Sequence, residues 1–468
     1  MARMNRKDPA PPRTHEGARA VKISPELELR RSVLATMLWE DQFYEEGESI
    51  ASRVQSLVSR VEPEKVAALA IEARIQMKLR HMPLLIAREM ARSERHRPFV
   101  AKVLGEIIQR ADELGEFLAL YWNEGKKPLS KQVKKGLALA FPRFDAYQLA
   151  KYNRGGLVTL RDVMFLVHPK PRNDEQAEIW KRLAGKTLEA PDTWEVNLSA
   201  GKDKKESWER LLREKKLGAM ALLRNLRNML EAKVDEELVK DALEHIHGER
   251  VLPFRFVSAA RHAPQWEGSI EKAMLRSLEG AEKLPGKTIL IVDVSGSMYY
   301  GRVSAHSEMD RAKVACALAV LVRELCEKPV IYATAGDDGR RVHATERVPE
   351  RRGFSLSDAI YSLTKPLGGG GIFLKQVMDY VYEKEKDADR IIVITDEQDC
   401  GIAKGDEPAG ARAFGRRNYL INVASYKNGI AYGTWHHIDG WSDAVLRYIG
   451  EFEKLPLGEQ ESFRKEKK

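Results

Sequence analysis

Four oxygen-bearing side chains are spaced so that they could bind a divalent cation. They follow two apolar runs and are Asp293, Ser295, Ser297 and Asp396. The runs, KTILIVDV (287–294) and RIIVIT (390–395), are typical of buried parallel strands. The carboxyl ends of such strands meet at one edge of a sheet, and Mg²⁺ prefers oxygen ligands while retaining some water. We therefore expect a cation site there; the alternative is a serine-rich turn that happens to follow a strand.

The DxSxS pattern at a strand end, with a later Thr-Asp pair, resembles the metal-ion-dependent adhesion site (MIDAS) of a von Willebrand factor A domain. The resemblance implies that a bend between the two strands supplies a threonine ligand. Here that bend reads GGGGI (368–372) and has no hydroxyl group. We therefore expect an incomplete site for Mg²⁺ or another divalent cation, in which water takes the place of the threonine and binding is weaker.

Residues of the types that catalyse reactions form no recognisable set. The glycine run is not followed by the GK[ST] of a phosphate-binding P-loop. The pair His436-His437 lacks the spacing of a metal-ligand motif, so satisfied or surface histidines are the expected reading. A metal-dependent nuclease would need carboxylates clustered around two metals, which a single DxSxS site does not supply. We expect a protein that is not an enzyme.

A second group of residues could bind a polyanion. Residues 51–171 hold 22 Lys and Arg against 12 Asp and Glu, whereas residues 288–468 hold 26 against 27. The stretch KKPLSKQVKK (126–135) has five lysines and no acid. If a helix begins near Pro128, three of them project to one side, namely Lys131, Lys134 and Lys135. With Arg143, we expect them to contact nucleic-acid phosphates; the alternative is an ordinary solvated helical surface.

The stretch KYNRGG (151–156) suits the same ligand. Lys151, Tyr152 and Arg154 lie beside a glycine pair that would end a helix. An aromatic ring between two cations can stack on a base while the cations contact phosphates on either side. By itself the stretch is not specific for nucleic acid.

The elements that must position these residues fall into two regions. From Ser24 to about Leu284, apolar residues recur at three- and four-residue spacing, which predicts successive helices in an α-solenoid or a closed ring of helical hairpins. The clearest helices are expected at 27–40, 63–79, 99–121, 208–230 and 269–279. After Pro285 the pattern alternates between strand and helix, which predicts a doubly wound α/β domain. Its strands are expected at 287–294, 329–334, 390–395 and 418–424, and its helices at 310–326, 374–385 and 442–452.

Composition excludes several classes of protein. Of the 468 residues, 43% are hydrophobic and 31% are charged, which rules out intrinsic disorder, collagen and a disulfide scaffold. The longest apolar run, 314–322, is about half of what would span a bilayer. The three cysteines are far apart and form no CxxC, as expected in a reducing compartment. With no apolar leader in residues 1–20, we expect a cytoplasmic protein that does not contact membranes, or a nuclear one if it is eukaryotic.

Several stretches of the sequence resemble those of one protein family. The sequence resembles the TROVE-domain family, which comprises the Ro ribonucleoprotein autoantigen and its bacterial relatives, over about residues 24–454. The stretches that carry the resemblance are LAKYNRGG with TLRDVMFLVHPKP (149–171), SWERLLREKKLGAMALLRNLRNML (207–230), LPFRFVSAARHA (252–263) and ILIVDVSGSM (289–298). Lys151 and His168 stand as far apart as the lysine and histidine of the family that contact RNA. The family's arginine four residues after that lysine is Gly155 here, with Arg154 one place earlier.

The resemblance implies both a fold and a function. The fold would be a ring of HEAT-like helical repeats closed by the A domain. We accordingly expect a disordered tail (1–22), an all-α repeat domain (23–285), a von Willebrand A-like α/β domain (286–456) and a charged tail (457–468). Y RNA would bind the basic outer face, and 3′ ends of misfolded noncoding RNAs would enter the central hole. A 3′-to-5′ exoribonuclease tethered through Y RNA would make the protein, as a monomer, a scaffold for RNA quality control, maturation or decay.

Two alternatives remain open at this point. His168 precedes a proline at the end of an apolar helix, so it could cap that helix instead of contacting RNA. The protein could instead be a metal-dependent protein–protein adaptor that binds an acidic partner through its A domain. The excess of basic residues would then be incidental to its function.

Overall fold

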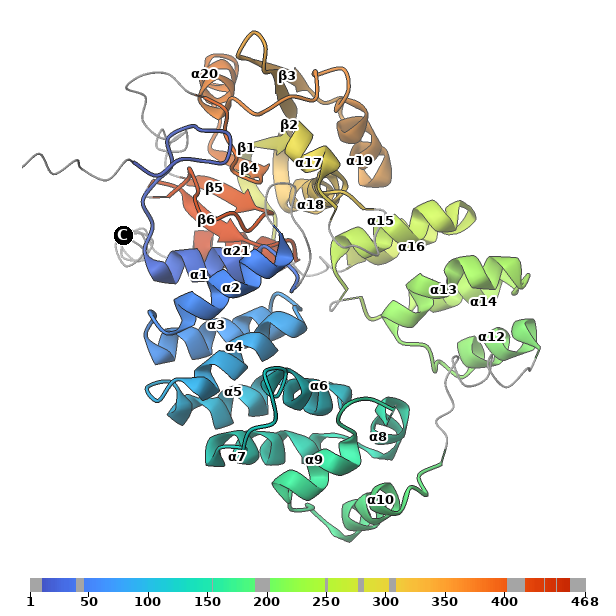
Figure 1. Ribbon diagram of the computed structural model, residues 1–468. Coiled ribbons are helices and arrows are strands. Elements are labelled where there is room, and N and C mark those ends of the chain that lie inside the picture. The colour runs from blue at the N-terminus through green and yellow to red at the C-terminus, as the bar shows by residue number, and fades with distance from the viewer. Residues whose placement is uncertain are drawn as a thin grey trace, which may run out of the picture. The chain divides into compact units, whose positions relative to one another are not determined.

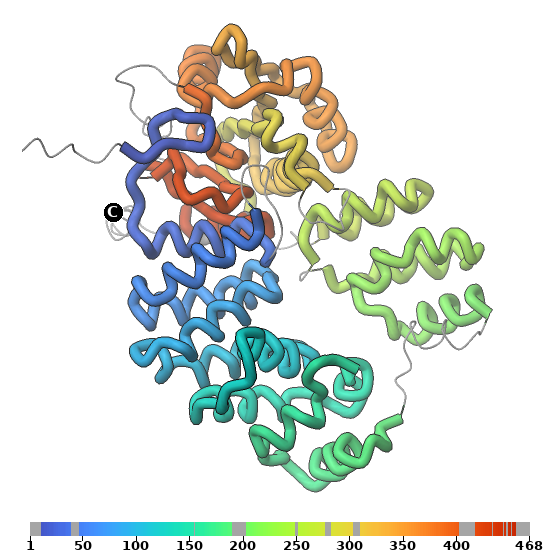
Figure 2. The backbone as a smooth tube through the Cα atoms, viewed as in Figure 1, coloured from blue at the N-terminus to red at the C-terminus, as the bar shows by residue number. Residues whose placement is uncertain are grey.

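The computed structural model (Figures 1 and 2) describes most of the chain. The described residues are 11–38, 46–153, 155–189, 203–248, 251–276, 282–302, 309–401, 417–432, 434–442 and 444–454. Their contacts divide the chain into two compact units, each with its own core. The helical unit is Ala51–Ser277, and the sheet unit joins Met1–Ile50 to Leu278–Lys468.

The helical unit is a stack of helical hairpins, as Figure 2 shows. Most helices pack against the next helix in the sequence and against the helix after that. For example, α3 contacts α5, α5 contacts α7, and α4 contacts α6. Such nearest-neighbour packing is that of the predicted helical repeats. The α-helices are α2 (Gly47–Val58), α3 (Pro63–Ile75), α4 (His81–Arg92), α5 (Val100–Ile107), α6 (Asp112–Tyr121), α7 (Lys131–Ala140), α8 (Ala146–Tyr152), α9 (Leu160–Val167), α10 (Asp174–Gly185), α12 (Lys204–Arg213), α13 (Ala219–Glu231), α14 (Glu236–Glu244), α15 (Pro253–His262) and α16 (Glu267–Arg276). Short 3₁₀ helices lie at Arg97–Phe99, Phe141–Arg143 and Pro264–Trp266.

Two long helices predicted from the sequence are each divided in two. The range 99–121 is interrupted at residues 108–111, where the buried carboxylate of Glu113 accepts hydrogen bonds from the backbone N–H groups of Gln109 (2.8 Å) and Arg110 (3.0 Å) and so stabilises the turn before α6. The range 208–230 is interrupted where Lys215 adopts a left-handed φ of 52° after α12 and Gly218 becomes the N-cap of α13. A local turn therefore interrupts a continuous apolar period in both places.

The sheet unit contains a mixed sheet in the order β3-β2-β1-β4-β5-β6. Its strands are β1 (Leu284–Asp293), β2 (Cys326–Asp337), β3 (Val342–Arg347), β4 (Arg390–Thr395), β5 (Arg417–Asn422) and β6 (His436–Asp439). All neighbours pair in parallel except β3, which runs antiparallel to β2 at one edge. Strands β1, β2, β4 and β5 were predicted from the sequence, whereas the two edge strands, β3 and β6, were not. The strand order reverses between β1 and β4, the point where ligands bind in doubly wound sheets.

Helices cover both faces of this sheet (Figure 1). They are α1 (Pro25–Leu34), α17 (Gly296–Tyr300), α18 (Arg311–Leu325), α19 (Gly353–Ser362), α20 (Leu374–Lys384) and α21 (Ala444–Lys454). On one face, Ile289 and Ile291 of β1 share a core cluster with Val377 and Val381 of α20. The alternate residues of β1 point to the opposite face, where α18 contacts β1, β2 and β4. The central strands are thus buried on both faces, as their continuous apolar runs predicted.

Residues 11–22 form hydrogen bonds with the sheet unit, which differs from the disordered tail expected for 1–22. The Thr14 hydroxyl donates to the Asp399 carbonyl (2.8 Å), and the Val21 amide donates to the Gly429 carbonyl (2.8 Å). The next helix, α1, contacts β6, and Arg31 within it is fully buried. The helical domain expected from residue 23 therefore begins later, at Ala51. Residues 1–10 and the expected charged tail at 457–468 lie outside the described residues.

Candidate functional sites

Helix α7 presents the three predicted lysines to solvent. The helix begins at Lys131, slightly later than predicted, because the Ser130 hydroxyl accepts a hydrogen bond from the Val133 amide (3.3 Å) and forms the N-cap. Lys131, Lys134 and Lys135 are exposed, and none forms an ion pair with another described residue. Their ammonium groups are therefore available to a phosphate backbone.

Lys151 lies in the last turn of α8 between two tyrosines. A capping box of Asp145 and Gln148 starts this short helix. The Lys151 Nζ atom lies 5.6 Å from the Tyr147 ring centroid and 5.8 Å from that of Tyr152. No carboxylate in the described part of the chain pairs with it. The expected combination of cation and aromatic ring is thus present.

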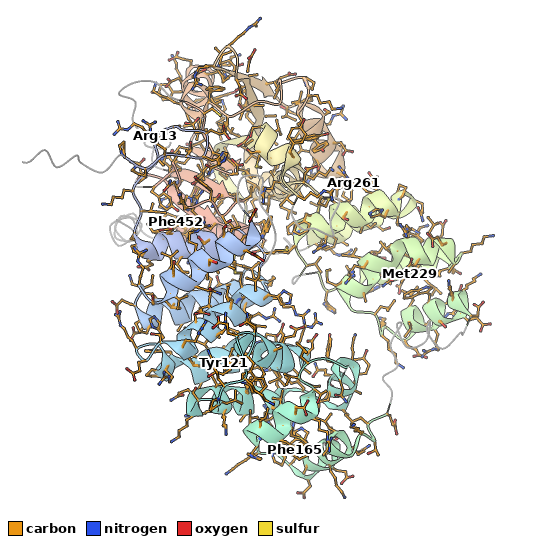
Figure 3. The ribbon with its side chains drawn as sticks, in the orientation of Figure 1. Arg13, Tyr121, Phe165, Met229, Arg261 and Phe452 are labelled. Atoms are coloured by element: carbon orange, nitrogen blue, oxygen red, sulfur yellow. The ribbon has the colours of Figure 1, made fainter. Side chains whose placement is uncertain are left out.

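His168 ends α9 in a left-handed conformation (φ 48°, ψ 60°). Its backbone N–H donates to the Met164 carbonyl (3.0 Å), so the main chain makes the capping bond. The imidazole is exposed and has no hydrogen bond to a described residue. In the same helix Phe165, labelled in Figure 3, is 52% exposed, with the Arg161 guanidinium 5.3 Å from its ring centroid. The described contacts thus do not support a capping role for the His168 ring.

Arg143 and Arg154 are the two remaining residues that were predicted to contact phosphates. The Arg143 guanidinium donates to the carbonyl of Ile108 and to that of Gly105 (2.6 Å) at the C-terminal end of α5. There it satisfies carbonyls that the helix leaves unpaired and complements the helix dipole. Arg143 remains exposed while it makes these bonds, and its phosphate contact stays a prediction. Arg154 lies outside the described residues.

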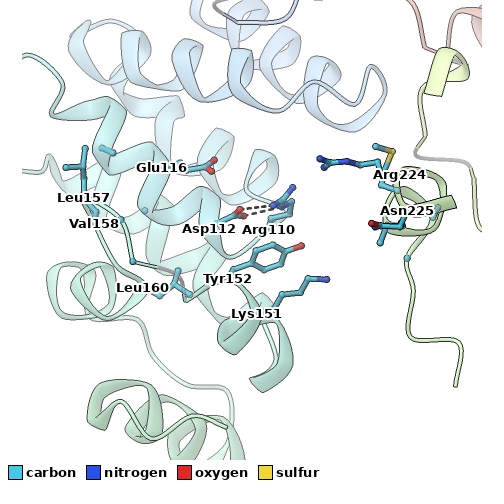
Figure 4. Close-up of a pocket in the computed structure, with 18 of the residues that line it drawn as sticks. Arg110, Asp112, Glu116, Lys151, Tyr152, Leu157, Val158, Leu160, Arg224 and Asn225 are labelled. Atoms are coloured by element: carbon cyan, nitrogen blue, oxygen red, sulfur yellow. Dashed lines mark hydrogen bonds and ion pairs between the residues drawn. The ribbon is translucent and has the colours of Figure 1, made fainter. Parts of the chain in front are cut away.

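A pocket of about 750 Å³ in the helical unit brings Lys151 together with residues that the sequence analysis did not select (Figure 4). Its walls include Arg110 and Tyr152 on one side and Arg224 and Asn225 of α13 on the other. The spacing of Arg110 and Arg224 in the sequence gave no indication that they share a pocket, since 113 intervening residues must first fold.

In the sheet unit, the four predicted cation ligands converge at the carboxyl ends of β1 and β4. Asp293 accepts hydrogen bonds from the Ser295 amide (2.9 Å) and the Thr395 hydroxyl (2.6 Å). The Ser295 and Ser297 hydroxyl oxygens are 3.4 Å apart. The glycine bend is adjacent, because the Gly296 amide donates to the Gly370 carbonyl (2.9 Å). Gly368 and Gly369 of the bend have φ of 95° and 63°, a conformation that glycine adopts without strain.

The electrostatics of this cluster are compatible with a cation. Burial, and after it the charge of Asp396, raises the pKa of Asp293 to about 7. Burial also raises the pKa of Asp396, although Ser297 and Arg311 oppose this. The Asp396 Oδ2 atom is buried and has no hydrogen-bond partner among the described residues. Two adjacent buried carboxylates with an orphaned oxygen and two hydroxyls fit a hard divalent cation.

A neighbouring ionic cluster was missed at the sequence level. Arg31 of α1 forms an ion pair with Glu397, and the His437 Nε2 atom lies 2.5 Å from the Glu397 carboxylate. Burial alone would lower the pKa of His437, but Asp439 and Glu397 raise it to about 9. All four side chains are at most 5% exposed. His437 is therefore satisfied inside the protein, one of the two roles expected for it.

Comparison with known proteins identifies the family. The family model for the TROVE domain matches residues 27–187 and 172–352, more than half of the chain. The chain belongs to the TROVE-domain family. Its similarity to Telomerase protein component 1 is 36% identity over 111 residues for the Mus musculus protein and 38% over 111 residues for the Rattus norvegicus protein. These matches cover 22% of this chain and 4% of either relative, so the chain spans only a small part of the curated relatives.

A solved structure supports the architecture of this TROVE-domain protein. The crystal structure of the Deinococcus radiodurans RO (RSR) protein aligns with a TM-score of 0.56 and 17% identity, over 91% of this chain and 99% of that chain. This likeness shows the fold, helical repeats joined to an α/β domain. Membership of the TROVE family implies RNA binding as the general function. Among the described residues, no helix is both long and apolar enough to cross a membrane.

Proposed function

We propose that this TROVE-domain protein is a noncatalytic scaffold for RNA. A small structured RNA of the Y RNA type binds the basic surface of the helical unit through α7, Lys151 and His168. Single-stranded 3′ ends of misfolded noncoding RNAs enter the central hole of the ring expected for the family. The complex serves RNA quality control, maturation or decay in the cytoplasm, with a 3′-to-5′ exoribonuclease tethered through the Y RNA.

The observation that carries this proposal is a set of cations, three exposed and one half-buried, that are not neutralised within the fold. Lys131, Lys134, Lys135 and Lys151 pair with no described carboxylate, and the His168 ring has no described hydrogen-bond partner. Like charges on one helix face repel each other, so a polyanion that neutralises them is favoured. Phosphate contacts of this kind hold and orient RNA without reading its sequence.

The first experiment is to purify the protein from its own cells at moderate salt and to sequence the RNA that accompanies it. An abundant small structured RNA is expected with the unaltered protein and not with the Lys151→Ala/His168→Ala double variant. In gel-shift titrations with that RNA, the double variant should bind at least about tenfold more weakly, because a phosphate contact and an imidazole contact are both removed. The matched control is Lys181→Ala/His245→Ala, which removes the same residue types where each is already paired with an acid. Equal RNA recovery from both double variants would exclude the assigned contacts.

A second candidate function is favoured by the buried carboxylate pair. In this reading the protein is an adaptor that binds an acidic partner protein through a divalent cation. Asp293, Asp396, Ser295 and Ser297 would hold Mg²⁺, and the bound ion would offer a coordination position to a carboxylate of the partner. Without a threonine in the bend, the protein holds the ion through fewer side-chain ligands.

Salt and chelator distinguish the two functions. RNA binding weakens log-linearly with salt concentration because counterions are released. A cation-bridged protein contact is instead lost when EDTA is added at constant ionic strength. Recovery of a protein partner that EDTA releases, with no enriched RNA, would favour the adaptor over the RNA scaffold.

A further inference from the structure

The N-terminal segment 11–22 folds into a turn that depends on Thr14. The Thr14 hydroxyl accepts a hydrogen bond from the Ala18 amide (3.0 Å) and donates one to the Asp399 carbonyl (2.8 Å). One hydroxyl thus closes the turn and attaches it to the loop after β4; Figure 1 draws the segment in blue. Within these residues, all of which the structure describes, only Thr14, Ala18 and Ala20 are buried. Because so little apolar area is buried, hydrogen bonds are the main attachment of the segment.

The loop after β4 carries the expected cation ligand Asp396, and the segment reaches this residue through Gln398. The His15 amide donates to the side-chain oxygen of Gln398 (2.7 Å). The backbone N–H of Gln398 donates to the Asp396 Oδ1 atom (3.0 Å), and its side-chain N–H donates to the Asp396 carbonyl (3.1 Å). Gln398 therefore connects the N-terminal backbone to a carboxylate whose other oxygen has no described hydrogen-bond partner.

The same loop is also fastened to the glycine bend and, through it, to the turn that carries the DxSxS serines. The Asp399 carboxylate accepts a hydrogen bond from the Leu374 amide (3.1 Å), directly after the bend. The Gly370 carbonyl of the bend accepts one from the Gly296 amide of the serine turn (2.9 Å). Segment 11–22 therefore holds the loop on one side of the cation site and, through the bend, supports the serine turn on the other.

The charges of the site make its arrangement sensitive to a cation. Asp293 and Asp396 are both fully buried, and their negative charges repel each other. A divalent cation between them would remove this repulsion and stabilise the loop to which the segment is attached. Coupling of this kind is reciprocal, so attachment of the segment would strengthen cation binding by the same factor.

We propose that attachment of segment 11–22 is coupled to divalent-cation binding at Asp293 and Asp396, with Thr14 as a positioning residue. The attached segment holds the loop in the arrangement that receives the cation, and the bound cation keeps the segment attached. The inference rests on the cation site of the second candidate function and adds a means of regulating it. Detachment of the N-terminal segment weakens the site.

The first test titrates Mn²⁺ into the full-length protein and follows the electron paramagnetic resonance signal of the free ion. Thr14→Val removes the hydroxyl and should weaken Mn²⁺ binding by about fivefold or more, as is usual for coupled sites. Thr14→Ser keeps the hydroxyl and should bind Mn²⁺ as the unaltered protein does. Thr288→Val is the matched control, because Thr288 is also a buried threonine of the sheet unit but bonds to Arg390 (2.8 Å), at the opposite end of β1 from Asp293. This control should leave Mn²⁺ binding unchanged.

Hydrogen exchange of the full-length protein measures the coupling in the other direction. Mg²⁺ should slow exchange in segment 11–22 of the unaltered protein and leave α3 to α7 as they are. In the double variant Asp293→Asn/Asp396→Asn, Mg²⁺ should have no effect on the segment.

The outcomes separate the coupling from the cation site itself. If the unaltered protein binds Mn²⁺ but Thr14→Val binds it equally tightly, or if Mg²⁺ leaves exchange in segment 11–22 unchanged, only the coupling is overturned. Equal weakening by Thr14→Val and by Thr14→Ser or Thr288→Val would also overturn it, because the Thr14 hydroxyl would not be the cause. If the unaltered protein binds no more Mn²⁺ than Asp293→Asn/Asp396→Asn does, the cation site fails, and the second candidate function and the coupling fail with it.

Discussion

Arginine and lysine side chains of the first helices have different roles. The arginines are held within the fold: Arg74 pairs with Glu113, Arg92 with Glu124, and Arg110 with Asp112. The planar guanidinium suits this use because it can donate two parallel hydrogen bonds to one carboxylate. The lysines of α7 instead remain exposed. The α7 lysines therefore carry a part of the basic excess of residues 51–171 that no described acid neutralises.

His437 gives a pH dependence of stability that can be measured. Its pKa is raised from 6.5 to about 9 in the folded protein, because Asp439 and Glu397 outweigh the effect of burial. The folded state thus binds this proton more tightly than the unfolded state, and the resulting stabilisation is complete below pH 6.5 and is lost as pH rises through about 9. It amounts to about 3 kcal/mol at most. Thermal melting of the sheet unit should show this loss between those pH values in the unaltered protein and not in His437→Gln.

The control for this measurement is His245→Gln, since the His245 side chain is 58% exposed. That variant should keep the pH profile of the unaltered protein. A His437→Gln profile that follows the unaltered protein through the whole range would contradict the buried ion pairs.

Whether a contact between two residues could be predicted from the sequence depends on which part of the fold brings the residues together. Asp293 and Asp396 could be paired from sequence, because parallel strands end at the same edge of a sheet whatever the loop between them. Arg31 and Glu397 could not, because their contact depends on where an N-terminal helix docks, 366 positions away along the chain. The hydrogen bonds of Arg143 could not be predicted for the same reason, since the carbonyls that accept them lie at the end of a different helix.

At the scale of elements, the contact between α5 and α7 depends on a glycine. A Cβ atom built on Gly136 would lie 2.7 Å from the Leu104 Cβ and 3.1 Å from the Ala101 carbonyl oxygen. Both neighbours belong to α5 and cannot move without shifting that helix. The glycine therefore permits the close approach that holds α7, with its exposed lysines, in the stack.

Gly136→Ala should lower the free energy of unfolding by about 1–3 kcal/mol through overpacking, although alanine is intrinsically favoured in a helix by about 1 kcal/mol. Thermal melting of the full-length protein measures the change. Gly268→Ala is the matched control, because Gly268 lies in α16 and its added Cβ would meet no atom within 4 Å. That variant should be neutral or slightly more stable; similar destabilisation in both would show that the α5–α7 contact is not the cause.

The lysine face of α7 makes a prediction for RNA binding. Changing Lys131, Lys134 and Lys135 together to glutamine should reduce the slope of log affinity against log salt by about one to three, one unit for each phosphate contact removed. Filter-binding titrations with the copurified RNA at several salt concentrations measure the slope. The control changes Lys181, Lys240 and Lys375 to glutamine, because each of these lysines is paired with an acidic residue. An unchanged slope in the α7 variant would mean that this face meets only solvent.

Element boundaries were less predictable than element types. The run 390–395 matches β4 because an apolar, β-branched segment buried on both faces has no competing structure. The break between α5 and α6 was missed because Glu113 holds the preceding turn while it is paired with Arg74 of a different helix. The edge strands β3 and β6 carry polar residues, so periodicity alone did not reveal them.

At the scale of the whole molecule, the sheet unit contains both the N-terminal and the C-terminal part of the chain. Segment 11–38 precedes the helical unit in sequence yet belongs to the sheet unit, through hydrogen bonds of Thr14 and Val21 and the buried ion pair of Arg31. The sheet unit is therefore complete only when both ends of the described chain have been made and brought together. Removing a side chain of segment 11–38 that contacts the sheet should therefore destabilise strands that lie far away in the sequence, such as β5 and β6.

Arg31→Gln tests this dependence. It leaves the fully buried Glu397 without its arginine partner, and breaking a buried ion pair costs about 3–5 kcal/mol. Hydrogen exchange should accelerate in β5 and β6, while the helices α3 to α7 of the other unit keep their protection, because they have cores of their own. Arg95→Gln is the control: its pair with Glu62 is exposed and screened by solvent, so little stability should be lost and the protection of β5 and β6 should not change. If Arg31→Gln instead loosened α3 to α7 and spared β5 and β6, segment 11–38 would not be part of the sheet unit, and the first helix would belong with the repeats as its position in the sequence suggests.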